Sequence, residues 1–353
     1  MSDDQPAREK ANENGHAKKV KLRELADYLG LSAATVSLVM NRSPAAKSIP
    51  HRTQVRVREA AKKLNYRPNL MARMLRQKRS FTIGVIVPEI SEGYAALVLS
   101  GIEDHLLQEG YFYLIVGHRH RKDLVEEYPR LLQERAVEGL IVVDTPTLGR
   151  TAVPVVAVSG HRQIAGATNI VLDHASAARN ALRHLAEQGH RQIAFLKGQA
   201  FSSDTEPRWR AIREATQQLG LPFCAELSAQ LTGESSSPAL GYEATRRLIA
   251  AGGGFTAIFA FNDVSAIGAI RALREAGRKV PEDVSVVGFD DIQSAAFQNP
   301  GLTTIRQPLR EMGEIAARTL LERIAAPAGA AYPKWITVKP ELVVRESSGP
   351  APR

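Results

Sequence analysis

The sequence of 353 residues has one cysteine, Cys224, two tryptophans and no long apolar run. A single cysteine excludes an internal disulfide framework and a cysteine-based zinc site, and it fits a reducing compartment. No apolar segment reaches the roughly 18 residues that a membrane span needs, and the N-terminus lacks the apolar core of a secretory signal. The sequence therefore predicts a cytoplasmic protein without a membrane partner. Hydrophobic residues make up 44% of the chain, which is enough for a large core.

Excess positive charge is confined to the first quarter of the chain. Residues 1–80 contain 18 Lys and Arg against 7 Asp and Glu, whereas the remaining residues contain 28 against 30. A basic cluster of this kind predicts binding to a polyanion, because each cation that neutralises a phosphate releases condensed counterions. On charge alone, a solvated basic face explains the pattern equally well.

The hydrophobic pattern divides the chain into three parts. Residues 1–18 are polar and aperiodic, which is typical of a disordered arm. Residues 19–66 have apolar side chains at helical spacing and predict a three-helix unit. From Phe81 onward, short apolar runs alternate with amphipathic helices, and this alternation implies parallel sheets covered on both faces. Seven or more such units exceed one compact sheet, so two α/β lobes are expected.

The stretch LADYLGLSAATVSLVMN, residues 25–41, predicts two short helices that meet at a steep angle. Gly30 can adopt the left-handed conformation that ends the first helix, and Ser32 can cap the second. This is the helix-turn-helix plan, in which the second helix lies in the major groove of DNA. The alternative is a helical hairpin inside a larger core. The outer face of the second helix is predicted to carry Ala33, Ala34, Ser37, Leu38 and Asn41.

Three motifs follow one another along the chain. In this order, VKLRELADYLGLSAATVSLVMN, LNYRPNLMARML and IGVIVP closely resemble the lactose-repressor (LacI/GalR) family of bacterial transcription regulators, over residues 20 to about 346. The resemblance implies an N-terminal all-α helix-turn-helix domain with a hinge helix, followed by a two-lobed α/β periplasmic-binding-protein-like domain with parallel sheets. It also implies a homodimer that binds double-stranded operator DNA and a small-molecule effector of the carbohydrate class, without a cofactor, metal or catalytic residue.

The domain boundaries follow from these patterns. We expect a helix-turn-helix domain over 19–66, a hinge helix and linker over 67–80, and an effector-binding and dimerisation domain over 81–346. The N-lobe of the last domain is expected to comprise 81–172 and 308–333, and the C-lobe 173–307 and 334–346. A frayed tail is expected over 347–353, because it is rich in Ser, Gly and Pro.

The resemblance assigns DNA contacts to two segments. The first segment is the second helix of the helix-turn-helix, residues 32–41. In this helix and the one after it, hydroxyl and amide groups suit phosphate hydrogen bonds that set the register, whereas Ala33, Ala34 and Leu38 can offer bases only apolar contact. The second segment, Asn69 to Arg76 with Ala72, matches a hinge helix that folds on the operator. Leu75 matches the leucine that enters a central minor-groove step and kinks the duplex. The positions that match polar DNA contacts are Ser32, Thr35, Ser37, Asn41 and Thr53.

Candidate effector contacts lie where predicted strands end, because ligands of open parallel sheets bind beyond the carboxyl ends of the strands. Asp173, Asn262 and Asp290 occupy such positions. By resemblance, Arg208 matches the effector-binding arginine of the family, and Asn262 and Asp290 match residues that bind ligand hydroxyls. Tyr94 is a candidate aromatic face for a sugar ring. For the acidic and amide residues at strand ends, helix capping is the alternative, and it is preferred for Asp263.

The loop EISEGY departs from the usual family pattern, and its two glutamates, Glu89 and Glu92, favour a cationic or amino-bearing effector. Two other protein classes share the predicted lobes. A transported-solute binding protein requires a secretory signal and has no use for the basic segment. A sugar-modifying enzyme without DNA function is the other alternative, but the sequence has no GxSxG, GxxxxGK[ST], HExxH or strand-linked GxGxxG motif. His118 and His120 in GHRHRK are interpreted as exposed loop residues. The sequence therefore predicts a DNA-binding regulator that is not an enzyme.

Overall fold

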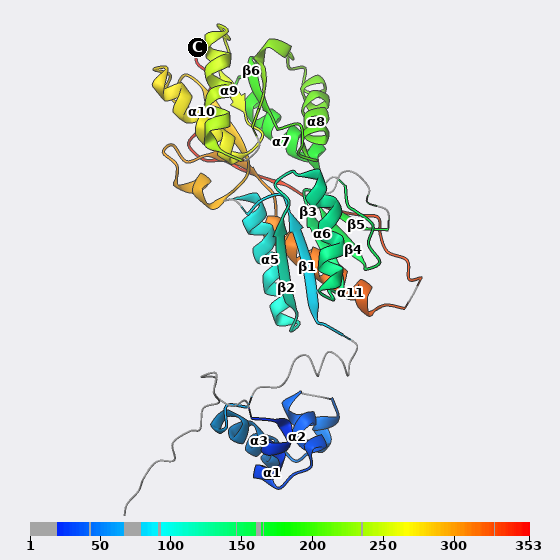
Figure 1. The fold of residues 1–353 in the computed structure, drawn as a ribbon. Helices are drawn as coiled ribbons and strands as arrows, with labels where there is room; N and C mark the ends of the chain where they lie inside the picture. The colour runs from blue at the N-terminus through cyan, green and yellow to red at the C-terminus, as the bar shows by residue number, and fades with distance from the viewer. Residues whose placement is uncertain are drawn as a thin grey trace, which may run out of the picture. The chain divides into compact units, whose positions relative to one another are not determined.

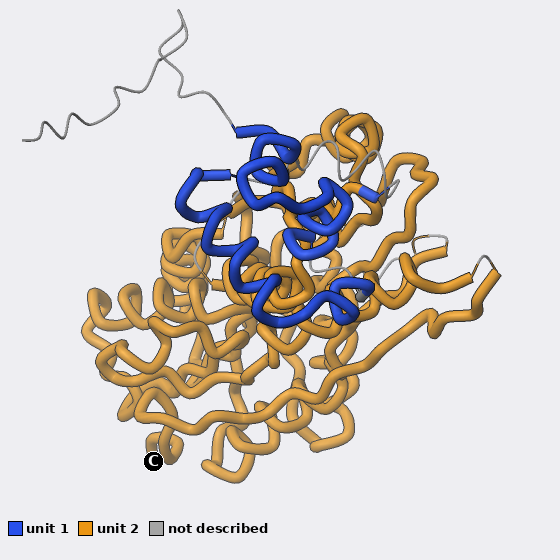
Figure 2. The backbone as a smooth tube through the Cα atoms, turned by 90° about the horizontal axis from the view of Figure 1, so that it is seen from below, with its two compact units in different colours: residues 1–79 blue, residues 80–353 orange. Residues whose placement is uncertain are grey.

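The computed structural model describes residues 20–41, 44–66, 79–90, 93–145, 147–159, 164, 166–233, 236–327 and 329–353. The chain forms two compact units, residues 1–79 and residues 80–353 (Figure 2). The predicted arm over 1–18 and the hinge residues Asn69, Ala72, Leu75 and Arg76 lie outside the described residues. Within the described ranges, no helix combines the length and the apolar character needed to cross a bilayer.

The first unit is a small helical domain (Figure 1). Gly30 ends α1 in the left-handed conformation (φ 64°), and the Ser32 hydroxyl accepts a hydrogen bond from the backbone N–H of Thr35 at 3.1 Å. Both features agree with the sequence prediction. The core between the helices is built from fully buried aliphatic residues, among them Leu25, Val36 and Val57. The elements are α1 (Leu22–Leu29), α2 (Ala33–Met40), a 3-10 helix η1 (Pro44–Ser48) and α3 (His51–Lys63).

The second unit contains two six-stranded sheets, one in each lobe. The N-lobe sheet has the strand order β11-β5-β4-β3-β1-β2, and all of its pairs are parallel. Helices α5 and α11 pack together and cover one face, while α6 covers the other. The N-lobe elements are β1 (Thr82–Val87), α5 (Tyr94–Gln108), β2 (Phe112–Gly117), α6 (Lys122–Glu134), β3 (Gly139–Val143), β4 (Val155–Val158), β5 (Thr168–Leu172), α11 (Leu309–Ala325) and β11 (Trp335–Val338).

The C-lobe sheet has the order β12-β10-β9-β8-β6-β7 and is parallel except for the antiparallel pair β10 and β12. Helices α7 and α8 cover one face, and α9 and α10 cover the other. The C-lobe elements are α7 (His174–Glu187), β6 (Ile193–Lys197), α8 (Thr205–Gln218), η2 (Ala225–Leu227), β7 (Ser228–Gln230), α9 (Pro238–Ala250), β8 (Ala257–Phe259), α10 (Asp263–Glu275), β9 (Ser285–Asp290), η3 (Gln293–Phe297), β10 (Thr303–Arg306) and β12 (Glu341–Val343).

The chain passes between the lobes three times, after β5, after β10 and after β11. The two-lobed prediction is confirmed, but one predicted boundary is wrong. Residues 334–346 were assigned to the C-lobe, whereas β11 pairs with β5 in the N-lobe, with Trp335 opposite Asn169. The reason is that β5 would otherwise be an edge strand of buried residues with unpaired backbone groups, and β11 pairs with them.

The C-terminal residues are ordered, which corrects the prediction of a frayed tail over 347–353. Ser347 is fully buried, and its hydroxyl donates to the carbonyl of Val286 at 2.6 Å while accepting from the N–H of Thr303. Further along, the carbonyl of Gly349 accepts from the side chains of His190 and Ser285. Polar tail residues are therefore fixed because they satisfy backbone groups of β9 and its neighbours.

Candidate functional site

Helix α2 presents a face with little hydrogen-bonding capacity. It contains no charged residue, Ala34 is exposed, and Ala33 and Leu38 are half-buried. Thr35 and Thr53 are also half-buried, and Ser32 is exposed with its hydroxyl 2.9 Å from the hydroxyl of Thr35. Any surface that meets this helix encounters the methyl groups of Ala33 and Ala34 beside the Ser32 hydroxyl at the N-terminal end, and Leu38 further along.

Ser37 departs from the prediction that it lies on this outer face. It is only 8% exposed, and the side-chain amide of Asn41 donates to its carbonyl at 2.8 Å and to its hydroxyl at 3.1 Å. The amide of Asn41 folds back over Ser37 because it ends the helix and satisfies a terminal carbonyl. Asn41 itself stays half-exposed, so its side-chain oxygen is the polar atom that this end of the helix offers.

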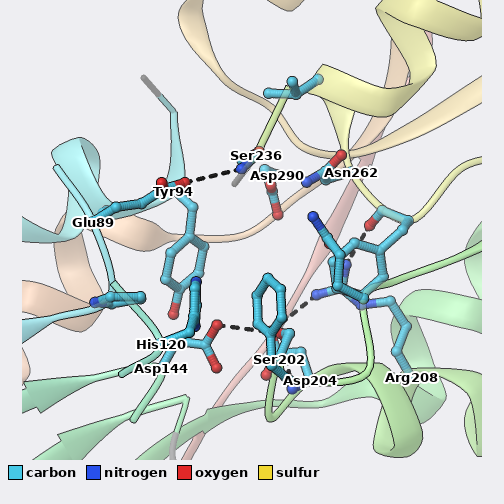
Figure 3. Close-up of a pocket in the computed structure, with 16 residues that line it drawn as sticks. Glu89, Tyr94, His120, Asp144, Ser202, Asp204, Arg208, Ser236, Asn262 and Asp290 are labelled. Carbon is cyan, nitrogen blue, oxygen red and sulfur yellow. Dashed lines mark hydrogen bonds and ion pairs between the residues drawn. The ribbon is translucent and has the colours of Figure 1, made fainter. Parts of the chain in front are cut away.

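A cavity between the two lobes of the second unit is the other candidate site (Figure 3). It has about 720 Å³ of space, counting the part open to solvent. Of the five predicted effector residues, four line it. Its described lining consists of Pro88, Glu89, Tyr94, Ala95, His120, Asp144, Gln199, Phe201, Ser202, Asp204, Arg208, Ser236, Phe261, Asn262, Val264 and Asp290.

Arg208 is held rigidly in the wall of this cavity. It lies on α8 one turn after Asp204, and its Nη2 is 3.0 Å from the Asp204 carboxylate. Its Nη1 donates to the carbonyl of Phe261. The guanidinium also lies over the rings of Phe261 and Phe289, 4.4 and 3.7 Å from their centroids. Only its Nε lacks a hydrogen-bond partner within the described chain, and it is buried.

Asn262 and Asp290 follow adjacent parallel strands, β8 and β9, as the strand-end rule predicts. The side-chain oxygen of Asn262 caps α10 by accepting from the N–H of Ser265 at 2.9 Å. The oxygen therefore serves as the helix cap, and the side-chain nitrogen is left for a ligand. Asp290 accepts from the Gln307 amide at 2.6 Å. It has φ 112°, a conformation that is strained for a residue with a side chain and that recurs at ligand sites.

The lobes are joined across the cavity by hydrogen bonds. Asp144 at the end of β3 accepts from the N–H of Ser203 at 3.0 Å and from the hydroxyls of Ser202 and Ser203. Glu89 after β1 accepts from the N–H of Ser236 at 3.0 Å (Figure 3). Tyr94 donates its hydroxyl to Ser159 within the N-lobe. Polar groups of the two lobes are therefore in direct contact beside the cavity, which stays partly open to solvent.

Burial changes the ionisation of the acidic side chains in the cavity. It raises the pKa of Asp290 to about 7, although the charge of Arg208 and the hydrogen bond from Gln307 oppose the rise. It also raises the pKa of Asp144 to about 7, with a further contribution from the charge of Asp204, against hydrogen bonds from Ser203 and Ser202. The pKa of Tyr94 lies well above its ordinary value, mainly because the hydroxyl is buried.

Two other acidic residues have structural roles. Asp173, predicted to bind effector, is absent from the cavity lining and caps α7 by accepting from the N–H and the hydroxyl of Ser176. The prediction failed because Asp173 ends an N-lobe strand at a crossing, where the next residue starts a C-lobe helix. Asp263 is buried and accepts from the N–H of Ile292 and the hydroxyl of Thr304. It joins α10 to the sheet rather than capping the helix, since Asn262 is the cap.

Several lining residues were missed by the sequence analysis. Asp144 ends the strand GLIVVD, so the strand-end rule was sufficient to find it. His118 is buried instead of exposed, and burial together with His120 lowers its pKa to about 4. His120 lines the cavity, where its ring lies on that of Phe201 with centroids 3.7 Å apart. No sequence signal indicated this pair, because the two residues come from loops of different lobes. Among the described residues, no group of three or more His, Cys, Asp or Glu could hold a metal ion.

Two family models and a characterised relative match this chain. The model described as "Bacterial regulatory proteins, lacI family" matches residues 21–69, and the model described as "Periplasmic binding protein-like domain" matches residues 182–348. A relative, the HTH-type transcriptional repressor PurR of Aliivibrio fischeri (strain MJ11), is 32% identical over 340 residues, which cover 92% of this chain and 97% of that protein. The chain belongs to the lacI family.

Solved structures of the same family extend over nearly the whole chain. The lac repressor dimer bound to operator and the anti-inducer ONPF is 26% identical, with a TM-score of 0.79, and covers 94% of this chain and 100% of that one. The complex of the transcriptional regulator CelR with cellobiose is 27% identical, with a TM-score of 0.68. The match covers 93% of this chain and 100% of the CelR chain. This lacI-family member is a DNA-binding transcriptional regulator with an effector-binding domain, as the sequence predicts.

Proposed function

We propose that the protein is a homodimeric repressor that binds a near-palindromic operator in the cytoplasm and has no catalytic activity of its own. Two copies of the helix-turn-helix domain, which we place at 19–66, bind half-sites whose spacing follows the two-fold axis of the dimer. The basic charge of residues 1–80 and the exposed end of α2 support this proposal. The lac repressor that it resembles was solved as a dimer on its operator.

The DNA contacts divide into positioning and recognition. Ser32, Thr35 and Thr53 offer hydroxyl groups to phosphates, and the half-exposed Asn41 offers its side-chain oxygen. Ala33, Ala34 and Leu38 offer methyl groups, which suit the C5-methyl of thymine. The remaining specificity is assigned to the hinge over 67–80, where Leu75 acts as a wedge in the minor groove and Asn69, Ala72 and Arg76 accompany it.

The effector is a carbohydrate-class small molecule that binds in the cavity between the lobes. One observation carries this proposal, namely that Tyr94 from the N-lobe meets Arg208, Asn262 and Asp290 from the C-lobe around one hollow. Amide, carboxylate and guanidinium groups can donate and accept at fixed angles toward hydroxyl groups. The related CelR was solved with cellobiose.

Coupling between the sites requires that the effector favour one arrangement of the lobes over another. The bonds from Asp144 to Ser202 and Ser203 and from Glu89 to Ser236 connect the two lobes, which supports this coupling. An effector that changes these contacts shifts the balance between closed and open lobes, and this balance controls the ordering of the hinge helices on DNA.

Genome-wide capture of DNA bound to the protein is the test, followed by titration of carbohydrates against the recovered operator. Operator affinity is expected to fall steeply with salt, with a slope of about −0.9 in log–log units for each phosphate contact. A salt-independent affinity, or the absence of recovered sites, contradicts DNA binding through the basic unit. Turnover of any added sugar by the purified protein contradicts the proposed lack of catalysis.

A further inference from the structure

The charge inside the effector cavity is unbalanced. Its described lining contains four carboxylates, one guanidinium and one imidazole. A neutral sugar can donate its hydroxyl groups to carboxylates, but it brings no positive charge to balance them. The excess of carboxylates over cationic groups therefore limits which ligands the cavity can accept. The four carboxylates belong to Glu89, Asp144, Asp204 and Asp290.

The single guanidinium is already neutralised. Arg208 is 3% exposed, its Nη2 pairs with Asp204 at 3.0 Å, and its Nη1 donates to the carbonyl of Phe261. The two phenyl rings over its faces exclude water from the charge. Because its charge is paired with Asp204 and its Nε is buried, an anionic ligand would not find a free cation at Arg208. Arg208 is thus suited to donate to a neutral oxygen of a ligand.

Asp290 is a cavity carboxylate without a direct ion pair among the described residues, although the charge of Arg208 acts on it from a distance. It is 6% exposed, and its Oδ1 accepts from Gln307, while its Oδ2 forms no hydrogen bond or ion pair with any residue in the described ranges. Figure 3 shows the side chain pointing into the cavity. Burying an ionised carboxylate without a positive partner is costly, and a ligand that brings a cation removes this cost.

Glu89 adds a second carboxylate from the opposite lobe. Its Oε1 accepts from the N–H of Ser236, and its Oε2 has no partner among the described residues. Because Glu89 belongs to the N-lobe and Asp290 to the C-lobe, a cation that attracts both also favours the closed arrangement of the lobes.

The rest of the cavity suits a ring with hydroxyl groups. The rings of His120 and Phe201, with centroids 3.7 Å apart and planes tilted by 32°, add aromatic surface to the lining, and aromatic rings supply a large apolar contact surface for the C–H groups of a sugar. The side-chain nitrogen of Asn262 has no partner within the described chain, since only its oxygen caps α10, so it can donate to a hydroxyl. Neutral polar contacts and carboxylates thus line the same hollow.

We propose that the effector is an amine-bearing carbohydrate whose protonated nitrogen faces Asp290, with Glu89 as the second carboxylate. This inference rests on the proposed function, because it names the chemical class of the effector that binds between the lobes. It assigns discrimination between aminated and neutral sugars to two residues on opposite lobes.

The test compares matched sugars on the full-length protein by calorimetry. The probes are glucosamine, galactosamine, mannosamine and the disaccharide made of two glucosamine units. Each is compared with the sugar that has a hydroxyl group in place of the amine and with its N-acetyl derivative. At least one amine is expected to bind about 30-fold more tightly than both of its partners, because only the amine supplies the charge. Equal or tighter binding of the neutral partners, or no binding of any amine, overturns the inference.

Variants connect the preference to the carboxylates. Asp290→Asn keeps an oxygen for Gln307 and removes the charge, and it is expected to lower the ratio of amine to parent affinity by about tenfold or more, with a smaller decrease for Glu89→Gln. The matched control is Glu243→Gln, which removes one charge from the exposed side of α9 and leaves the ratio unchanged. An unchanged ratio in Asp290→Asn overturns the inference.

Operator binding is measured in the same samples, so that two failures can be told apart. If neutral sugars bind and change operator affinity while amines do not, the charge inference fails and carbohydrate control stands. If no carbohydrate binds or changes operator affinity, both the inference and the carbohydrate effector fail, while the family assignment is unaffected.

Discussion

The DNA-facing helix and the effector cavity use charge in opposite ways. Helix α2 carries no charged residue, and the basic side chains of the first 80 residues lie elsewhere in that segment. In the cavity, by contrast, Arg208, Asp204 and Asp290 are all buried. Solvated cations attract a polyanion over distance but are screened by salt. Buried charges act at short range and discriminate strongly, because an unmatched charge there is costly. The difference indicates that charge serves mainly affinity in the DNA-binding segment and mainly selectivity in the effector cavity.

The largest effect is expected from removing a buried charge. Arg208→Met removes the guanidinium that pairs with the buried Asp204, and this should lower the free energy of unfolding of the second unit by about 3–5 kcal/mol. The matched control Arg210→Met, exposed on the same helix, should change it by less than about 0.5 kcal/mol. Urea unfolding followed by circular dichroism gives both values. Similar midpoints for the two variants would show that the cavity charges are as solvated as the surface charges.

The pH dependence of stability tests the same contrast. Burial raises the pKa of Asp290 from 3.8 to about 7, so the folded protein holds this proton more tightly than the unfolded chain. Stability should therefore decrease as pH rises from about 4 to 7, and Asp290→Asn, which cannot ionise, should avoid this loss. The neighbouring charges that act on Asp290 are Arg208 and Asp204.

We expect the variant to gain about 2–4 kcal/mol relative to the parent between pH 4 and pH 8, in the absence of sugar. Thermal unfolding of both proteins at the two pH values measures the gain. A difference between parent and variant that does not change with pH would mean that Asp290 titrates as an exposed carboxylate does.

A moderate effect is expected at the start of α2. Ser32→Ala removes the cap on the N–H of Thr35 and should destabilise the helix by about 1 kcal/mol, whereas Ser32→Asn retains a capping oxygen. Amide hydrogen exchange over 33–40 in the full-length chain reports the change. Equal exchange in the two variants would show that tertiary packing, not the cap, holds the helix.

The smallest effect is expected from Leu38→Ala. Loss of an apolar contact with one thymine methyl should relax preference at a single base pair by less than about 1 kcal/mol, without changing the salt slope. Sequencing of selected operator variants measures the preference. If preference is lost at several base pairs, α2 contributes more specificity than its uncharged face suggests.

The fold was predictable where hydrophobic periodicity was strong. Strands such as β1 and β9 are continuous apolar runs between helices, so their position and parallel pairing followed from the sequence. The strands that were missed, β7, β10, β11 and β12, have only three or four residues, and several are partly exposed. Of these, β7, β11 and β12 lie at sheet edges, where the neighbouring strand decides the pairing, and the residues of β11 were therefore assigned to the wrong lobe.

The cavity was predictable only one lobe at a time. The strand-end rule found Asn262 and Asp290, because adjacent parallel strands bring their ends together. It gave no information on contacts across the lobes, such as Asp144 with Ser203 or His120 with Phe201. These pairs depend on how far the lobes are closed, and sequence periodicity does not encode that angle. Ser37 was misplaced for a local reason, since the amide of Asn41 covers it.

The three passages of the chain between the lobes have a consequence for synthesis on the ribosome. Translation adds ~5–20 residues per second. The helical unit over 20–66 is contiguous in the sequence, so it can fold as soon as it has left the ribosome. The N-lobe cannot complete its sheet until β11 has been made, near the end of translation, although most of its strands emerge early. A nascent chain therefore has a formed helix-turn-helix well before it has a finished effector cavity, and premature termination would leave the first without the second.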